Sequence, residues 1–188
     1  MKETDTNIVD YARKFAQETH KNHKRRDGIT TYLDNLEGVV NRLKNLGVTN
    51  NNVLCAAWLH NILENKNITF DQINERFGRE VAVTVMSLTK DENIPKKNSE
   101  IQYVNQLKNA AFSTKIIKLC DISTNLKDLA NAPLSKTQKN KQCKIFLHYL
   151  RVIKSDISKN KSTYPKVQEI IDGINTICIK FNQKPIVI

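Results

Sequence analysis

The 188-residue sequence lacks the features that would direct a chain to a membrane or out of the cell. No apolar run approaches the ~20 residues that cross a bilayer, and residues 1–20 read as a charged amphipathic helix without the apolar centre of a signal peptide. No Cys-x-x-Cys pair occurs, and the cysteines are widely spaced at Cys55, Cys120, Cys143 and Cys178. Three of them fall on apolar helix faces. We therefore expect a cytoplasmic protein with no membrane association and with buried, reduced thiols, in preference to disulfides or a zinc site.

Aromatic residues are also scarce, at 6% of the chain, and no recognised nucleic-acid motif is present. The charge, however, is uneven. Residues 1–94 hold 13 Lys+Arg and 13 Asp+Glu, whereas residues 95–188 hold 17 and 6, so the second half supplies the whole net charge of +11. Much of it lies in the Lys96-Lys97 loop and in Lys136, Lys139, Lys141 and Lys144. Two interpretations stay open: a solvated lysine-rich surface, or attraction of polyanions such as phosphorylated nucleotides or nucleic acid.

Apolar residues recur at helical spacing along most of the chain, and strand-like alternation is nowhere convincing. One stripe runs from Ile8 to Phe15, and another runs from Tyr32 to Leu46, where Gly47 can end the helix. Residues 53–63 are apolar on most sides, as in a central buried helix. The pattern predicts an all-α fold, a single domain over residues 1–188 built as a bundle of about eight to ten helices.

Helix starts are indicated by capping patterns. Thr69-x-x-Gln72 and Ser135-x-x-Gln138 are capping boxes, in which a hydroxyl and an amide satisfy the free backbone N–H groups of a first turn. Ser113 is predicted to cap the helix that carries Asp121. An aspartate at the centre of an apolar helix is costly to bury without a partner, so Asp121 is predicted to belong to a site or an ion pair.

The most informative stretch is Trp58–Asn65, Trp-Leu-His-Asn-Ile-Leu-Glu-Asn. A helix places residues four apart on one face, so we expect His60 and Glu64 to point the same way, with Asn61 and Asn65 one step round. The stretch resembles the HD superfamily of phosphohydrolases, which has Leu-His-Asp here, and its alarmone-hydrolase branch, which has Leu-His-Asp-x-x-Glu-Asp. Both Asp positions are Asn in this chain.

Three further blocks resemble the same branch and occur in the expected order. Residues 20–32 read His-x-x-x-x-Arg-Arg-Asp-Gly-x-Thr-x-Tyr, residues 73–90 contain Ile-x-x-x-Phe-Gly-x-Glu-Val and then Leu-Thr-Lys, and residues 115–129 read Lys-Ile-Ile-Lys-Leu-Cys-Asp-Ile-Ser-Thr-Asn-Leu-Lys-Asp-Leu. The likeness covers roughly residues 8–155. The compact length resembles the stand-alone small alarmone hydrolases more than the long RelA/SpoT enzymes.

The resemblance implies a divalent metal, manganese or similar, with ligands at Asn35, His60, Asn61 and Asp121. The family has His where Asn35 stands and Asp where Asn61 stands. An amide carbonyl can bind a hard cation, but it carries no charge and does not replace an imidazole for a transition metal. We therefore expect weak or absent metal binding.

The resemblance also assigns catalytic and substrate-binding positions. Glu64 and Asn65 stand where the family has the Glu-Asp pair that activates and positions water, and an amide cannot act as a general base. The substrate-binding positions are Arg25, Arg26, Tyr32 and Asn125. Arginine pairs suit phosphates and stack on bases. Two departures remove charge expected to face phosphates: Ile122 replaces a lysine, and Asn98-Ser99-Glu100 replaces Glu-Arg-Lys.

The resemblance implies removal of the 3′-pyrophosphate from guanosine tetra- or pentaphosphate, with some members acting on NADPH. For this chain we favour a degenerate member that binds a phosphorylated purine nucleotide with weak or no hydrolysis. One alternative is an active metal-dependent phosphohydrolase with an altered ligand set. Another is a non-catalytic scaffold or a nucleic-acid-binding protein. The oligomeric state is left open.

Overall fold

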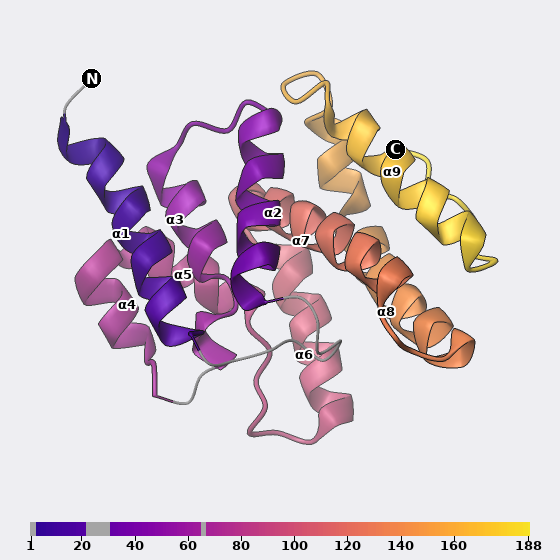
Figure 1. Ribbon diagram of the computed structural model, residues 1–188, viewed down its shortest axis with the longest axis horizontal. Coiled ribbons are helices and arrows are strands. Elements are labelled where there is room, and N and C mark those ends of the chain that lie inside the picture. Colours follow the sequence, from indigo (N-terminus) through magenta and orange to yellow (C-terminus); the bar gives the residue numbers. More distant parts are fainter. Residues whose placement is uncertain (1–2, 22–30, 65–66) are drawn as a thin grey trace.

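The computed structural model describes residues 3–21, 31–64 and 67–188, with side chains from residue 8 onward. These residues form nine α-helices and one 3-10 turn and contain no strand (Figure 1). The helices are α1 (Glu3–Thr19), α2 (Tyr32–Asn45), α3 (Asn51–Leu59), α4 (Phe70–Phe77), α5 (Arg79–Leu88), α6 (Lys96–Asn109), α7 (Phe112–Asn131), α8 (Lys136–Lys159) and α9 (Val167–Lys180), and the 3-10 turn η1 spans Ile62–Glu64. The all-α prediction and the predicted number of helices are confirmed for this part of the chain.

Helix α7 lies at the centre of the arrangement and packs against α2, α5, α8 and α9. In Figure 1 it runs across the middle of the molecule, with α1, α3, α4 and α5 on one side and α8 and α9 on the other. Its burial follows from its composition, because apolar residues occupy several sides of the helix. The fully buried members include Ile117, Leu119, Cys120, Ile122 and Leu126. No helix within the described residues is both long and apolar enough to cross a membrane.

Helix α3 ends earlier than the apolar run 53–63 predicts. It stops at Leu59, and His60 occupies the C-cap position before the chain tightens into η1. The Nδ1 atom of His60 lies 2.8 Å from the carbonyl oxygen of Ala57 and so satisfies a backbone acceptor of the last helical turn. The prediction that His60 and Glu64 share one face of a continuous helix is therefore wrong, because the α-helical register stops between them.

The capping predictions have different outcomes. Thr69 and Ser135 form the predicted capping boxes with Gln72 and Gln138. The prediction for Ser113 is wrong: α7 begins at Phe112, its N-cap is Ala111, and no side chain bonds the first turn. The Lys96-Lys97 segment, expected as a loop, forms the start of α6 after Pro95.

Helices α2 and α7 approach closely at Gly38. A Cβ atom at this position would lie 3.0 Å from the Cγ2 atom of Thr124 and 3.3 Å from the Nη1 atom of Arg42. Arg42 also crosses between the two helices, because its Nε donates to the Oγ atom of Ser123 at 3.2 Å. Glycine thus allows contact between two helices that both carry predicted site residues.

All four cysteines are buried and free, as predicted. Burial raises the pKa of Cys55 to about 11. The Sγ atoms of Cys143 on α8 and Cys178 on α9 lie 3.9 Å apart. These thiols are part of the packing between the last two helices.

Candidate functional site

The predicted site centres on Asp121, whose side chain is 8% exposed on the central helix α7. Its Oδ2 atom accepts a hydrogen bond of 2.8 Å from the Nζ atom of Lys118, one turn earlier. Its Oδ1 atom accepts from the Nδ2 atom of Asn125 at 2.5 Å and lies 3.4 Å from the Nε2 atom of His60. Three of the sequence-predicted site residues, His60, Asp121 and Asn125, are therefore brought together.

The charges at this centre stabilise one another. Burial alone would raise the pKa of Asp121, but Lys118 and His60 hold it well below its usual range. Burial alone would lower the pKa of Lys118, but Asp121 and the Tyr103 phenol raise it well above its usual range. Because each shift favours the charged form, Asp121 and Lys118 form a buried ion pair. The sequence-based prediction of a site or an ion pair at Asp121 is confirmed for the ion pair.

His60 reaches this pair from the end of α3. The side chain is 3% exposed, and its contact with the Ala57 carbonyl requires a proton on Nδ1, since a carbonyl can only accept. The other ring nitrogen, Nε2, faces the Asp121 carboxylate. No described residue forms a hydrogen bond to this buried nitrogen.

Asn35 on α2 is 1% exposed, and neither of its amide atoms has a hydrogen-bond partner among the described residues. An unsatisfied buried amide costs about 1–3 kcal/mol. Buried polar groups usually have a hydrogen-bond partner. This unpartnered amide lies on α2, which packs directly against α3 and α7, the helices of His60 and Asp121.

Glu64 lies at the rim of the site. Its side chain is exposed in η1, yet the surrounding protein desolvates the carboxylate enough to raise its pKa, opposed by the charge of His60 and reinforced by that of Asp121. Asn61 is half-buried, and within the described part of the chain no side-chain hydrogen bond or ion pair joins it to the Asp121 centre. Asn65, Arg25 and Arg26, predicted for catalysis and substrate binding, lie outside the described residues.

Tyr32 and His20 stack on each other with ring centroids 4.7 Å apart, which brings the first residue of α2 onto the end of α1. The sequence resemblance named both positions but did not indicate that their rings touch. The Nδ2 atom of Asn125, besides its contact with the Asp121 side chain, donates to the backbone carbonyl of Asp121 at 2.9 Å. Its predicted substrate-binding role stays a prediction.

A second polar cluster adjoins the ion pair and was missed by sequence reasoning. Lys90 donates to the Oε2 atom of Glu100 at 2.6 Å and also to the hydroxyl of Tyr149, and Tyr149 donates to the same carboxylate oxygen at 3.0 Å. The Nζ atom of Lys118 lies 5.5 Å from the ring centroid of Tyr103 and 5.3 Å from that of Tyr149. Both ammonium groups thus lie near both tyrosine rings, and each is paired with a carboxylate, Lys90 with Glu100 and Lys118 with Asp121.

The only signal for this cluster in the sequence was indirect. Lys90 and Lys118 belong to blocks that resemble the family, but their partners Tyr103 and Tyr149 come from separate helices at no diagnostic spacing. Glu100 was interpreted as part of a lost basic stretch. In the structure it forms an ion pair with Lys90, and the pKa of Glu100 is lowered, since hydrogen bonds from Lys90 and Tyr149 outweigh its partial burial.

The residues present do not fit a resident transition metal. The four positions that the resemblance assigns to the metal offer one imidazole, one carboxylate and two neutral amides, and the carboxylate of Asp121 is already neutralised by Lys118. Among the described residues, no group of three or more His, Cys, Asp or Glu side chains is placed to hold a metal ion.

The sequence is similar to proteins of a known family. A family model described as an HD domain matches residues 12–149. The guanosine-3′,5′-bis(diphosphate) 3′-pyrophosphohydrolase MESH1 of Danio rerio is 30% identical over 158 residues, covering 83% of this chain and 88% of that protein. MESH1 of Xenopus tropicalis is 34% identical over 128 residues, covering 67% of this chain and 72% of that protein.

The fold is shared with a solved structure as well. The structure of a metazoan SpoT orthologue that hydrolyses ppGpp superposes with a TM-score of 0.67 at 19% identity, covering 93% of this chain and 92% of that chain. At this identity the likeness establishes the fold alone.

Proposed function

The chain belongs to the HD-domain family, as a homologue of the MESH1-type guanosine polyphosphate 3′-pyrophosphohydrolases, and on that premise we propose that it binds a phosphorylated purine nucleotide with weak or no hydrolysis. The observation that carries the second half of this proposal is the chemistry of the four positions that the family resemblance assigns to a metal. The single carboxylate at these positions forms an ion pair with Lys118, and Asn35 contributes a neutral amide with no partner among the described residues.

Nucleotide binding is supported by residues at the positions that the family resemblance assigns to substrate binding. Tyr32 offers an aromatic ring at the start of α2, and Asn125 offers an amide that can both donate and accept. Arg25 and Arg26 supply in the sequence the guanidinium pair that suits phosphates, although they lie outside the described residues. The relatives are named for acting on a guanosine polyphosphate.

The chemistry left to this chain is limited. Glu64 can accept a proton, and its raised pKa brings it nearer to the range that suits a general base. However, phosphate-ester cleavage depends mainly on stabilising charge in the transition state, and a lone carboxylate adds negative charge where cations are needed. Lys118 is held by Asp121, so it is not free to follow a reacting phosphate.

A second candidate function is a slow, metal-dependent phosphohydrolase, and a specific observation favours it. The Nε2 atom of His60 and both amide atoms of Asn35 are buried without a hydrogen-bond partner among the described residues. Such unpartnered buried polar atoms are expected where side chains bind a metal ion or a substrate. A hard divalent cation that arrives with substrate phosphates could use them. A sharp metal optimum for turnover would support this candidate over the first.

The cytoplasm is the compartment that we propose for this function. All four cysteines are free and buried, and the Cys143 and Cys178 thiols lie close together without a bond between them. Thiol pairs of this kind stay reduced in the cytoplasm.

A melting experiment tests nucleotide binding. A ligand at a hundred times its dissociation constant stabilises the folded state by ~2.7 kcal/mol, which shifts the melting temperature measurably. We expect guanosine tetraphosphate or NADPH to raise it, less at high salt, and Arg25→Ala with Arg26→Ala to abolish the shift. As a control of equal charge, Lys14→Ala with Arg79→Ala should leave the shift intact. A panel of nucleotides with no effect at millimolar concentration would overturn the proposal.

Elemental analysis and a turnover assay test the second part of the proposal, that hydrolysis is weak or absent. Protein purified without added metal should contain far less than one transition-metal ion per chain, and pyrophosphate release from guanosine tetraphosphate should be slow or absent. Stoichiometric manganese, iron or zinc that is lost on His60→Ala, together with rapid turnover, would replace this proposal by the active phosphohydrolase.

A further inference from the structure

The solvent-facing side of α8 has an unusual composition. Ten residues of this helix are exposed: Lys136, Thr137, Gln138, Lys141, Lys144, His148, Arg151, Ser155, Ser158 and Lys159. Five of the ten are Lys or Arg, the other five are neutral polar residues or histidine, and none is acidic or apolar. We call these ten residues, together with the half-buried Lys154, the α8 basic face.

The positive charge of this face is not cancelled locally. The one acidic residue of α8, Asp156, pairs with the buried Lys115 on α7, whose Nζ atom lies 2.5 Å from the Asp156 Oδ2 atom, and Lys159 acts on it only through a smaller charge interaction. Lys144 and Arg151 form no ion pair with a described carboxylate. A solvated surface that needed cations only for solubility would gain more from interspersed acids.

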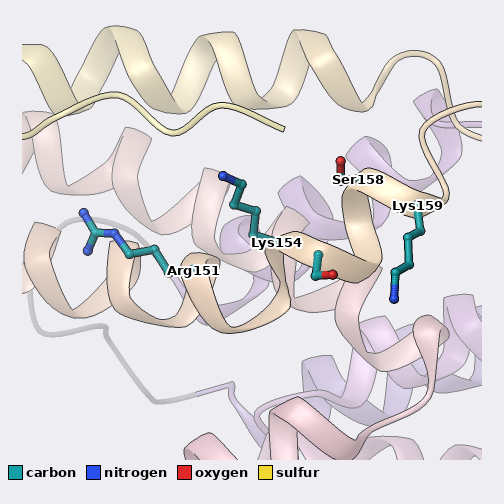
Figure 2. Close-up of a pocket in the computed structure, with 5 residues that line it drawn as sticks. Arg151, Lys154, Ser158 and Lys159 are labelled. Atoms are coloured by element: carbon teal, nitrogen blue, oxygen red, sulfur yellow. The ribbon is translucent and has the colours of Figure 1, made fainter.

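The C-terminal half of the face is also hollowed. A shallow groove of about 440 Å³ is lined by Arg151, Lys154, Ser155, Ser158 and Lys159. Figure 2 shows the long side chains of Arg151, Lys154 and Lys159 extended from the helix. Guanidinium, ammonium and hydroxyl groups are the side chains that most often contact phosphate oxygens in protein–DNA complexes.

The composition of the face discriminates among polyanions. An anionic membrane is disfavoured because helices that lie on a bilayer insert apolar side chains, and the exposed positions of α8 contain none. Single-stranded nucleic acid is disfavoured because it is held by bases stacked on aromatic rings, and the face has no Phe, Tyr or Trp. What remains is a partner recognised through regularly spaced phosphates alone.

The length of the face fits such a partner. A helix of 24 residues is about 36 Å long, close to one turn of a nucleic-acid duplex. Duplex DNA carries one negative charge per ~1.7 Å of its axis, so several phosphates can face this helix at once. We propose that the α8 basic face binds the sugar–phosphate backbone of duplex nucleic acid without reading its sequence.

This surface is distinct from the candidate nucleotide site. The side of α8 that faces the core carries Tyr149, which contacts Lys90 and Glu100 beside the Asp121 centre. The basic face lies on the exposed positions of the same helix. Duplex binding therefore requires neither the nucleotide site nor its ligand.

Fluorescence anisotropy with labelled duplexes of about 20 base pairs, roughly two helical turns, tests the proposal on the full chain. Duplex DNA and duplex RNA of the same sequence are the two probes, because both present the same phosphate chemistry. We expect binding to at least one of them at low salt, weakening steeply as salt rises. Lys144→Glu with Arg151→Glu should weaken binding about tenfold or more and reduce the salt slope by about two, one for each lost phosphate contact.

The matched control reverses two exposed cations on the other side of the molecule. Lys14→Glu with Arg79→Glu, on α1 and α5, changes the net charge by the same amount but lies away from α8 (Figure 1). It should leave affinity within about twofold, since distant charges are screened. Equal weakening by both pairs would show that net charge alone is responsible and would overturn the proposal. So would tighter binding to single strands of equal charge or to phosphatidylserine vesicles, or no duplex binding at low salt.

Discussion

The Nζ atom of Lys118 lies 2.8 Å from the Oδ2 atom of Asp121, and both side chains are buried within α7. The two residues are one helical turn apart, so the pair forms within a single element. Its formation therefore depends on α7 alone, whereas the wider site depends on how α2, α3 and α7 pack together. The pair keeps the centre of the bundle electrically balanced.

The first prediction concerns this balance. Asp121→Asn should destabilise the protein by about 3–5 kcal/mol, because it leaves the Lys118 ammonium buried without its counter-charge. Adding Lys118→Met should recover much of that loss, since a buried cation is then no longer present. Urea unfolding measures both. Glu75→Gln on the exposed side of α4 is the control and should change stability little. Equal stability of the single and double variants would show that the pair is not what matters at Asp121.

The second prediction gives the pH range over which the pair stabilises the fold. The folded pKa of Asp121 is depressed, so its contribution is complete above the unfolded value of ~3.9 and is lost as pH falls below it. The folded pKa of Lys118 is raised, so its contribution is complete below ~10.4 and is lost as pH rises above it. The stability difference between the native protein and the Lys118→Met, Asp121→Asn double variant should therefore stay flat between about pH 5 and 9. A slope inside that range would contradict these shifts.

The third prediction concerns Glu64, whose ionised form is expected to destabilise the folded state at neutral pH. The pKa of Glu64 is raised by partial burial, so its ionised form is less favourable in the folded state than in the unfolded chain. Glu64→Gln should therefore raise the melting temperature at neutral pH. The gain should disappear as pH falls through the unfolded value of ~4.3, where the native glutamate is protonated in both states. A melting temperature that falls at neutral pH would mean that the carboxylate makes a stabilising contact.

The fourth prediction separates the two serines that were expected to cap helices. Ser135→Ala should cost about 1 kcal/mol, because the Ser135 hydroxyl accepts from the backbone N–H of Gln138. Ser113→Ala, inside the first turn of α7 rather than at its N-cap, should cost less than half of that or even stabilise the helix. Chemical unfolding of the two variants side by side checks the assignment, and equal costs would contradict it.

The fifth prediction tests whether the candidate site lacks only the side chains that would bind a metal. Asn35→His, Asn61→Asp and Asn65→Asp together should restore metal binding and some pyrophosphohydrolase activity, and each single change should give much less, because such residues act as a unit. Isothermal titration with manganese and a pyrophosphate-release assay measure the two effects. A triple variant that binds metal without turnover would move the defect to substrate recognition, with Ile122 and Asn98-Ser99-Glu100 as the next positions to change.

Much of the fold was predictable from the sequence because its signals are local. The stripe from Tyr32 to Leu46 became α2, and the capping boxes at Thr69 and Ser135 start helices where predicted. A capping box involves residues three apart, so nothing distant is needed to read it. The prediction for Ser113 was wrong because a hydroxyl group alone does not show at which residue a helix begins.

The site was only partly predictable because several of its contacts are not local. The likeness to the HD family indicated His60, Asp121 and Asn125, and the structure places them together. The end of α3 at Leu59 could not be predicted from the sequence, because apolar residues resume at Ile62 and Leu63. The contact between His60 and the Ala57 carbonyl has no signature in the composition. The tyrosines of the second cluster come from α6 and α8, and only tertiary packing reveals that they meet.

The contact at Gly38 sets how far a side chain must reach inside this bundle. Because the glycine already lets α2 rest against Thr124, the two helices have no spare distance through which to move closer. Position 35 lies one turn before this contact on the same helix, and asparagine is shorter than histidine. A shift of α2 toward α7 cannot compensate for the shorter side chain. The distance between the two helices therefore decides how far a residue at position 35 reaches into the bundle.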